Sequence, residues 1–130
     1  MDSSRLTQMI TADPYAAHLG LSLVGDPDAV VVQMTVGPQH LNFLGTTHGG
    51  AMFSLADCAF SLASNASGER AVAIDTHLVI TGGSAEGDVL TARAEESTRG
   101  RTLGTYRITV TRGDGRVVGL FTGTVHISAG

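Results

Sequence analysis

One stretch decides the fold. Residues 40–50 read His40-Leu41-Asn42-Phe43-Leu44-Gly45-Thr46-Thr47-His48-Gly49-Gly50, and a run from Ala51 to Asn65 follows. The first part is polar and contains glycines, which is typical of a turn. The second part has no Gly, no Pro and a single carboxylate, that of Asp57. The stretch predicts one long helix that begins near His48 or Gly49 and ends before Gly68.

The rest of the chain predicts strands and one short helix. Asp13-Pro14 is a helix-start signal, and Gly20 is a stop signal. Residues 1–12 are expected to be flexible or weakly helical. Strands are predicted over residues 21–24, 29–36, 71–80, 88–96, 102–111 and 117–127, with a turn over residues 97–101. Four strands in succession after a long apolar helix favour an antiparallel sheet, hence an α+β fold in a single domain over residues 1–130.

The composition excludes several classes of protein. The chain has 130 residues, 42% of them hydrophobic, and a net charge of −4 with no lysine, which argues against nucleic acid as a partner. One cysteine, Cys58, excludes an internal disulfide and favours a reducing compartment. No apolar run is long enough to span a membrane, and the N-terminus lacks the features of a signal peptide. We therefore expect a cytoplasmic location.

The predicted helix carries a narrow polar stripe. Its members share a spacing of three or four residues and are Ser54, Asp57, Ser61, Ser64 and Asn65. The stripe is either a solvated face or the wall of a cavity or subunit contact. Solvated helix faces usually carry Lys, Arg and Glu, so small residues with a single Asp favour the cavity or contact.

The helix N-terminus is a candidate site for a developing negative charge. Helix N-termini present unpaired N–H groups, and glycine lets a ligand approach the backbone closely. Gly49-Gly50 therefore predicts an oxyanion hole, unless the two glycines only shape a tight turn. Asp57 follows Gly49 by eight residues, which is roughly 12 Å along the helix. If both serve one site, the carboxylate must come from a second copy of the chain; otherwise Asp57 is a structural carboxylate at a subunit contact.

Other residues of the loop remain open to two interpretations. His48 either orients the substrate or caps the helix, and Asn42 either holds a water or carbonyl or stabilises the turn. The five histidines have no metal-ligand spacing, so no metal is expected. No cofactor is expected either. The chain has no serine in a Gly-x-Ser-x-Gly setting, no P-loop and no dinucleotide-binding fingerprint.

These motifs together resemble a known family. Asn42, His48-Gly49-Gly50, Leu55-Ala56-Asp57 and Ala59-Phe60 resemble the hotdog-fold acyl-CoA thioesterases of the phenylacetate-degradation (PaaI-type) group. The similarity runs from about His40 to the C-terminus. It implies an antiparallel sheet wrapped around one central helix, homodimers with shared active sites, and homotetramers built from them. It also implies an acyl-CoA substrate, with phenylacetyl or hydroxyphenylacetyl as the acyl group.

The resemblance also implies roles for single residues. The Gly49 amide polarises the thioester carbonyl, Asp57 of the neighbouring subunit acts as general base or nucleophile, and His48 and Asn42 position the thioester or the water. The expected substrate-binding residues are Gly50, Ser61 and a turn that resembles the one approaching the CoA phosphates, Arg99-Gly100-Arg101-Thr102. The alternative for this turn is that its two arginines are simply solvated. The chain departs from the family pattern at residues 79–83. The rival functions are an acyl-thioester hydratase or dehydratase, and a non-catalytic acyl-CoA-binding module.

Overall fold

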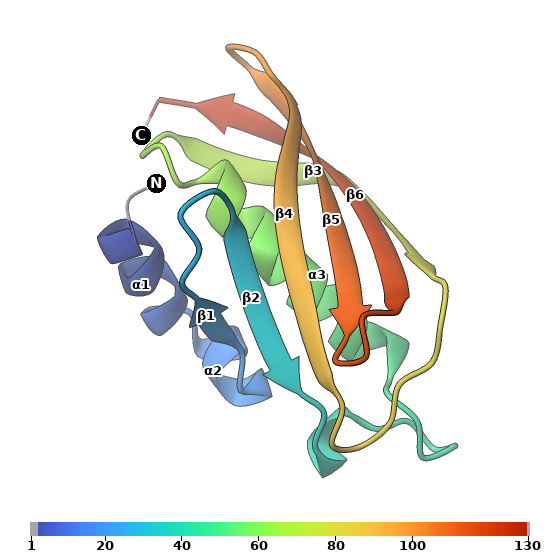
Figure 1. The fold of residues 1–130 in the computed structure, drawn as a ribbon. Helices are drawn as coiled ribbons and strands as arrows, with labels where there is room; N and C mark the ends of the chain where they lie inside the picture. The colour runs from blue at the N-terminus through green and yellow to red at the C-terminus, as the bar shows by residue number, and fades with distance from the viewer. Residues whose placement is uncertain (1–2, 130) are drawn as a thin grey trace.

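The computed structural model describes residues 3–129 and encloses one long helix, α3 (Gly49–Ser64), in a curved sheet (Figure 1). The sheet has six antiparallel strands: β1 (Ser22–Val24), β2 (Val30–Thr35), β3 (Arg70–Ile80), β4 (Val89–Arg99), β5 (Leu103–Arg112) and β6 (Val117–Ser128). Two short helices, α1 (Ser3–Thr11) and α2 (Pro14–Leu19), precede β1, and a 3₁₀ turn, η1 (Pro38–His40), precedes the loop to α3. The predicted hotdog architecture is confirmed.

Local signals set the ends of α2 as predicted. The Asp13 carboxylate accepts hydrogen bonds from the backbone N–H groups of Tyr15 and Ala16, and Pro14 occupies the first turn. Gly20 ends the helix at φ +71°, a left-handed conformation that glycine adopts without strain. This places Asp13 and Tyr15 at a fixed position beside α3.

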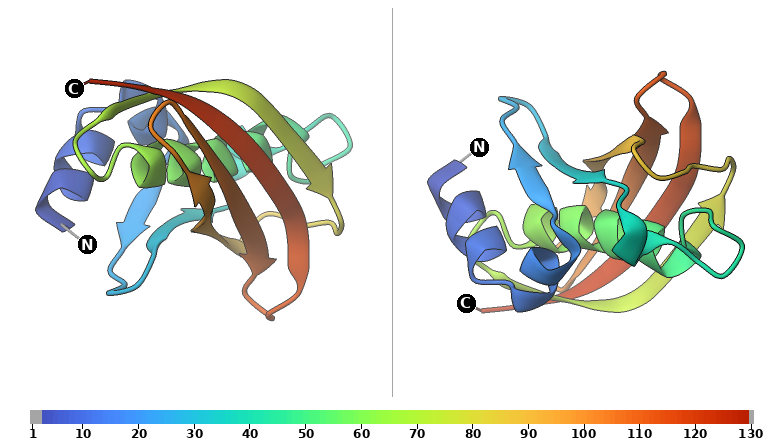
Figure 2. Two further views of the ribbon diagram at one scale, coloured as in Figure 1. Left: turned by 90° about the horizontal axis from the view of Figure 1, so that it is seen from above. Right: turned by 90° about the horizontal axis from the view of Figure 1, so that it is seen from below.

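The strand order is β1-β2-β4-β5-β6-β3, which differs from a simple succession of hairpins. Strands β4, β5 and β6 do follow one another as antiparallel neighbours, and residues 113–116, which include Asp114-Gly115, form the turn between β5 and β6. Strand β3, however, pairs with β6 and not with β4, its successor in sequence. The connection from β3 to β4 therefore crosses the sheet, and β3 lies at an open edge (Figure 2).

The predicted turn over residues 97–101 is wrong at its start. Strand β4 continues to Arg99, which pairs with Gly104, and Thr98 pairs with Thr105 after an irregularity that follows Glu96. Only residues 100–102 form the turn. The strand extends further because β5 is long enough to pair with it, which local sequence signals do not reveal.

The N-terminal segment is a regular helix rather than a flexible arm. Helix α1 buries Leu6 in the core, and the Arg5 guanidinium donates to the Asn65 carbonyl at the end of α3. Residues 1 and 2 of the same prediction lie outside the described residues.

The core forms between α3 and the concave face of the sheet. Phe60 packs against Phe121 and Tyr106, and Leu55 is fully buried. Gly123 faces the Phe60 ring so closely that a Cβ there would come within 2.6 Å of it, so only glycine allows this close packing of helix and strand. Among residues 3–129 no helix is long and apolar enough to cross a membrane.

Candidate active site

The N-terminus of α3 is organised by His48. This residue is the N-cap, and its Nδ1 accepts a hydrogen bond of 2.8 Å from the Gly50 N–H. Its own backbone N–H donates to the His40 carbonyl at 2.7 Å. Because Nδ1 accepts, the ring proton lies on Nε2, which is left as a donor toward solvent. The capping interpretation of His48 is therefore confirmed, and the capping imidazole still presents one N–H outward.

Gly49 supplies the unpaired donor at this helix start. Within residues 3–129 its N–H has no acceptor, as expected for the first residue of a helix. Gly49 lies in a groove of about 320 Å³, whose other lining residues are Thr46, Thr47, Met52, Ile80, Thr81, Gly82, Gly83 and Ser84. The segment that departs from the family pattern, residues 79–83, thus forms much of this groove.

The two glycines have different reasons to be glycine. A Cβ on Gly49 would meet the Ile80 Cδ1 at 3.2 Å, at the side of the groove. A Cβ on Gly50 would lie 3.0 Å from the His48 Nδ1, so glycine there lets the imidazole fold back over the helix start. Gly50 thus shapes the cap, whereas Gly49 leaves its N–H open to a ligand.

Asn42 closes its own loop. Its Oδ1 accepts from the N–H groups of Leu44 and Thr46 at 2.9 and 3.1 Å, and its Nδ2 donates to the Thr46 Oγ1 at 3.0 Å. This geometry matches the turn-stabilising interpretation. At the tip of the loop Phe43 is 97% exposed and Leu44 is 73% exposed. Two neighbouring large apolar side chains that are this exposed to solvent are typical of a contact surface.

Asp57 lies in a separate cavity of about 230 Å³ on the flank of α3. The cavity is lined by Asp13, Tyr15, Ala16, Leu21, Phe53, Ser54, Asp57, Cys58 and Ser61. Ser54, Asp57 and Ser61 belong to the polar stripe, so this part of the stripe is a cavity wall, whereas Ser64 is buried. No group within residues 3–129 donates a hydrogen bond to the Asp57 carboxylate. Burial raises its pKa from the usual value, and the nearby Asp13 carboxylate raises it further.

Gly49 and Asp57 do not meet within one chain. The groove beside Gly49 and the cavity beside Asp57 share no lining residue. The eight-residue separation on a straight helix accounts for this, at roughly 1.5 Å per residue. The two parts of the predicted site therefore lie apart from each other on one helix.

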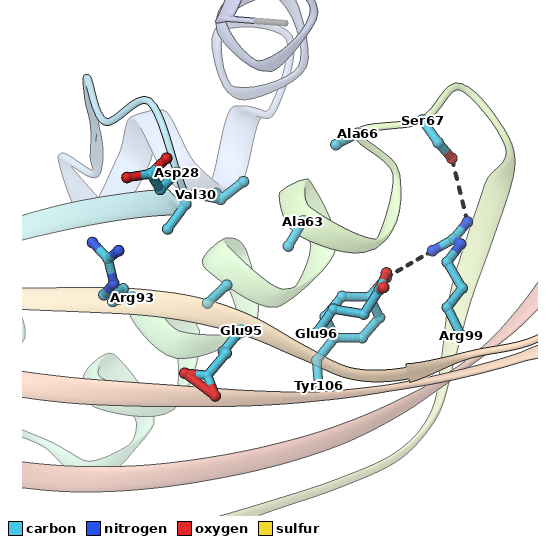
Figure 3. A pocket seen from close by; sticks show the side chains of 12 residues that line it. Asp28, Val30, Ala63, Ala66, Ser67, Arg93, Glu95, Glu96, Arg99 and Tyr106 are labelled. Atoms are coloured by element: carbon cyan, nitrogen blue, oxygen red, sulfur yellow. Dashed lines mark hydrogen bonds between the residues drawn. The ribbon is translucent and has the colours of Figure 1, made fainter. Parts of the chain in front are cut away.

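Arg99 is engaged by its own chain. Its guanidinium donates to the Tyr106 hydroxyl and the Ser67 Oγ, at 2.7 and 3.3 Å (Figure 3). It also donates to the Ser64 carbonyl and the Glu69 carboxylate, at 3.1 and 3.2 Å. The Tyr106 hydroxyl donates in turn to Glu96 at 2.9 Å, beside a cavity of about 410 Å³. Arg99 is neither solvated nor part of the turn. The interpretation of two solvated turn arginines is therefore wrong for this residue.

The remaining members of the predicted CoA turn follow Arg99. Gly100 donates its N–H to the Leu103 carbonyl at 2.8 Å, and the Thr102 carbonyl accepts from Ile127 at 2.8 Å. Arg101 is exposed, and no acceptor within residues 3–129 binds its side chain. Of the two arginines, Arg101 is thus the one whose guanidinium is open to a phosphate.

Sequence reasoning missed the part played by His40. It is fully buried, and both ring nitrogens are hydrogen-bonded: Nδ1 to the Gly37 N–H and Nε2 to the Leu19 carbonyl. No local pattern marks such a residue, because Leu19 lies 21 positions away in sequence.

Comparisons with known proteins agree on one family. A model described as the thioesterase superfamily matches residues 44–119. Acyl-coenzyme A thioesterase PaaI of Escherichia coli strain K12 is 38% identical over 119 residues, which are 91% of this chain and 85% of the relative.

Solved structures give the same result. The E. coli PaaI protein from the phenylacetic acid degradation operon superposes with a TM-score of 0.93 at 36% identity, covering 98% of this chain and 94% of that one. A mutant of the phenylacetic acid degradation protein PaaI from Thermus thermophilus gives 0.83 at 41% identity, covering 88% and 98%. A hypothetical thioesterase protein with coenzyme A from Streptococcus pneumoniae gives 0.79 at 28% identity, covering 84% and 86%. The chain therefore belongs to the thioesterase superfamily, as a hotdog-fold thioesterase of the PaaI-type group.

Proposed function

We propose that this protein hydrolyses acyl-CoA thioesters to a carboxylic acid and CoA. The observation that carries the proposal is the unpaired Gly49 N–H at the N-terminus of α3, which opens into a groove. An N–H in this position, together with the helix dipole, stabilises the negative charge that develops on a thioester carbonyl oxygen under attack. The name of the E. coli relative, an acyl-coenzyme A thioesterase, and the S. pneumoniae structure with coenzyme A support this substrate class.

In the proposed reaction Asp57 supplies the base or the nucleophile. Its carboxylate has no partner within the described chain and is partly desolvated, which suits a group that must accept a proton or attack a carbonyl. As a general base, Asp57 takes a proton from the water that adds to the thioester carbon; as a nucleophile, it adds to this carbon itself, and water then hydrolyses the resulting anhydride. In both routes the C–S bond breaks, and the CoA thiolate leaves and takes up a proton. The His48 Nε2–H points away from the cap and is available to position the thioester.

The Asp57 carboxylate sets the pH dependence expected of this reaction. It must be ionised to accept a proton, and burial together with Asp13 raises its pKa above 3.8. We therefore expect kcat/KM to fall as the pH drops through this raised pKa, at a higher pH than an ordinary aspartate would give. Asp13→Asn removes the neighbouring charge but keeps an N-cap of similar quality, so it should move the acid limb to lower pH. A pH–rate profile that is identical in both proteins would contradict the assignment to Asp57.

The second half of each site is proposed to come from a second copy through the open edge of β3. Four large apolar side chains of this strand are between 46% and 60% exposed: Val72, Ile74, Val79 and Ile80. A long edge strand with apolar side chains is a ready template for pairing with another strand. Pairing of β3 with β3 of a second copy about a two-fold axis satisfies both edges at once and extends the sheet across the dimer. The homotetramer stays a prediction.

Contacts between α3 and β3 suggest the register of this pairing. At the start of the helix, Ile80 lies against Gly49. At its end, the Asn65 side chain exchanges two hydrogen bonds of 3.0 Å with the backbone of Ala71. The helix and β3 therefore run in opposite directions, side by side. Asp57 lies midway between Gly49 and Asn65, so it is level with the middle of β3.

A two-fold axis close to Leu78 places the end of one β3, which lies beside Gly49, opposite the middle of the other β3, which lies beside Asp57. Gly49 of one copy is then level with Asp57 of the other. We therefore expect Leu78→Cys to form a disulfide-linked dimer under mild oxidation, because facing residues across antiparallel strands have Cβ atoms about 5 Å apart. Non-reducing electrophoresis measures the link. Val72→Cys, on the same strand, is the matched control and should stay unlinked, as should the parent chain with its buried Cys58. Linking through position 72 instead of 78 would overturn this register.

The acyl group is proposed to be phenylacetyl or a ring-hydroxylated phenylacetyl. The support is the origin of the E. coli PaaI protein, which comes from a phenylacetic acid degradation operon, together with the apolar Met52 and Ile80 in the groove beside Gly49. Steady-state kinetics against a panel of acyl-CoAs test both levels of the proposal. Preference for aliphatic chains would reject the acyl group alone, whereas absence of hydrolysis across the panel would reject the function.

A further inference from the structure

His40 ties three segments together from a buried position. It is 2% exposed. Its Nδ1 accepts from the Gly37 N–H at 2.9 Å, so the proton is on Nε2, which donates to the Leu19 carbonyl at 2.7 Å. Its backbone carbonyl accepts from the His48 N–H at 2.7 Å. The imidazole is therefore a neutral, single tautomer, and it occupies both of its hydrogen-bonding positions within the protein.

The hydrogen bonds of His40 lead toward both parts of the proposed site, the Asp57 cavity on one side and the N-terminus of α3 on the other. Leu19 is the last residue of α2, whose first turn, with Asp13 and Tyr15, lines the cavity around Asp57. The carbonyls in the last turn of a helix lack intrahelical partners, so the bond from His40 holds the end of α2 in place. On the other side, the His40 carbonyl holds His48.

The chain of hydrogen bonds continues to the proposed oxyanion donor. With its N–H held by His40, His48 turns its Nδ1 to the Gly50 N–H. Two of the three consecutive N–H groups at the helix start are then occupied, and that of Gly49 alone is left open. The orientation of this donor thus depends on where His40 lies.

We propose that His40 is a positioning residue, which fixes α2 and the Asp57 cavity relative to the N-terminus of α3. This inference rests on the proposed hydrolysis. Since Gly49 and Asp57 of one chain are proposed to serve different sites of the dimer, His40 links the two active sites. The essential bond is the one from Nε2 to Leu19, because it alone reaches α2; the bond to Gly37 only stabilises the local turn.

A pair of variants separates the two ring nitrogens. In His40→Gln the amide nitrogen can take the place of Nε2 and keep the bond to Leu19, whereas in His40→Asn the amide oxygen can take the place of Nδ1 and keep only the bond to Gly37. Each variant loses one buried hydrogen bond, so both should lower Tm. We expect His40→Asn to have a kcat at least about tenfold below that of His40→Gln. KM should stay within about threefold, since substrate binding is not removed.

Amide hydrogen exchange gives a readout that needs no activity. The N–H groups of His48 and Gly50 should exchange faster in His40→Asn than in His40→Gln, and ¹⁵N NMR of the parent should show His40 with its proton on Nε2. Equal kcat and equal exchange in the two variants, or a different tautomer, would overturn the proposal. A parent that hydrolyses no acyl-CoA would reject the proposed function, while the exchange and NMR results would still decide the place of His40.

Discussion

Asp57→Asn is expected to lower kcat for acyl-CoA hydrolysis by about 10³-fold, within the range that positioned general bases contribute. The amide has nearly the shape of the carboxylate but can neither accept the proton of an attacking water nor form an acyl intermediate. Kinetics with the best substrate of the panel measure the loss. Glu86→Gln, which neutralises an exposed carboxylate in the loop before β4, is the control and should keep parental turnover.

The thermal stability of Asp57→Asn should not fall along with its turnover. Because the folded chain raises the pKa of Asp57, the folded state binds its proton more tightly than the unfolded state does. The stability tied to this proton is present at low pH and is lost as pH rises from 3.8 through the raised pKa. At neutral pH the ionised carboxylate therefore lowers the free energy of unfolding, whereas the uncharged Asn side chain does not. We expect Asp57→Asn to have a Tm at or above that of the parent. Near-parental turnover of this variant would contradict the catalytic role of Asp57.

Gly49→Pro is expected to lower kcat by about 10²- to 10³-fold, the usual effect of deleting one oxyanion-hole donor. Proline removes the N–H that we propose as this donor. The backbone can accept the change, because proline is favoured at the first position of a helix and His48 already has an extended conformation, with φ −64° and ψ 134°. The fold and the assembly should thus survive, which circular dichroism and sedimentation would verify.

Gly49→Ala is the matched control for the proline variant. Alanine also adds a Cβ, which lies 3.2 Å from the flexible end of Ile80, but it keeps the N–H. Turnover should therefore stay within about tenfold of the parent, well above that of Gly49→Pro. If both variants lose activity equally, crowding of the groove and not loss of the donor explains the effect, and the oxyanion assignment fails.

Local sequence signals predicted the elements that carry the site. The start of α3 falls at Gly49, as the glycines after a polar loop indicated, and α2 has the predicted cap at Asp13. These features depend on residues within a few positions of one another. The spacing of Gly49 and Asp57 on one helix was likewise enough to exclude a shared site within one chain, and the two separate cavities agree with it.

Features that depend on distant partners were not predicted. The edge position of β3 results from its pairing with β6, some 50 residues later, and this edge is where we propose that the second copy binds. The burial of Arg99 depends on Ser64, 35 positions away, and on Tyr106 across the hairpin. The buried position of His40 was not predicted either, because its partner Leu19 lies 21 positions away in sequence. Pairing over such separations is set by the packing of the whole sheet, which no local pattern encodes.

The central claim is that one active site takes Gly49 from one chain and Asp57 from another, and mixing two inactive variants tests it most directly. Asp57→Asn and Gly49→Pro are unfolded together, refolded at equal concentration and assayed. Half of the dimers are then mixed, and each mixed dimer holds one intact site, so activity should return to about one quarter of the parental rate. Each variant refolded alone should stay inactive. Activity in the mixture no higher than in the separate variants, with mixed dimers present by mass spectrometry, would contradict the shared site.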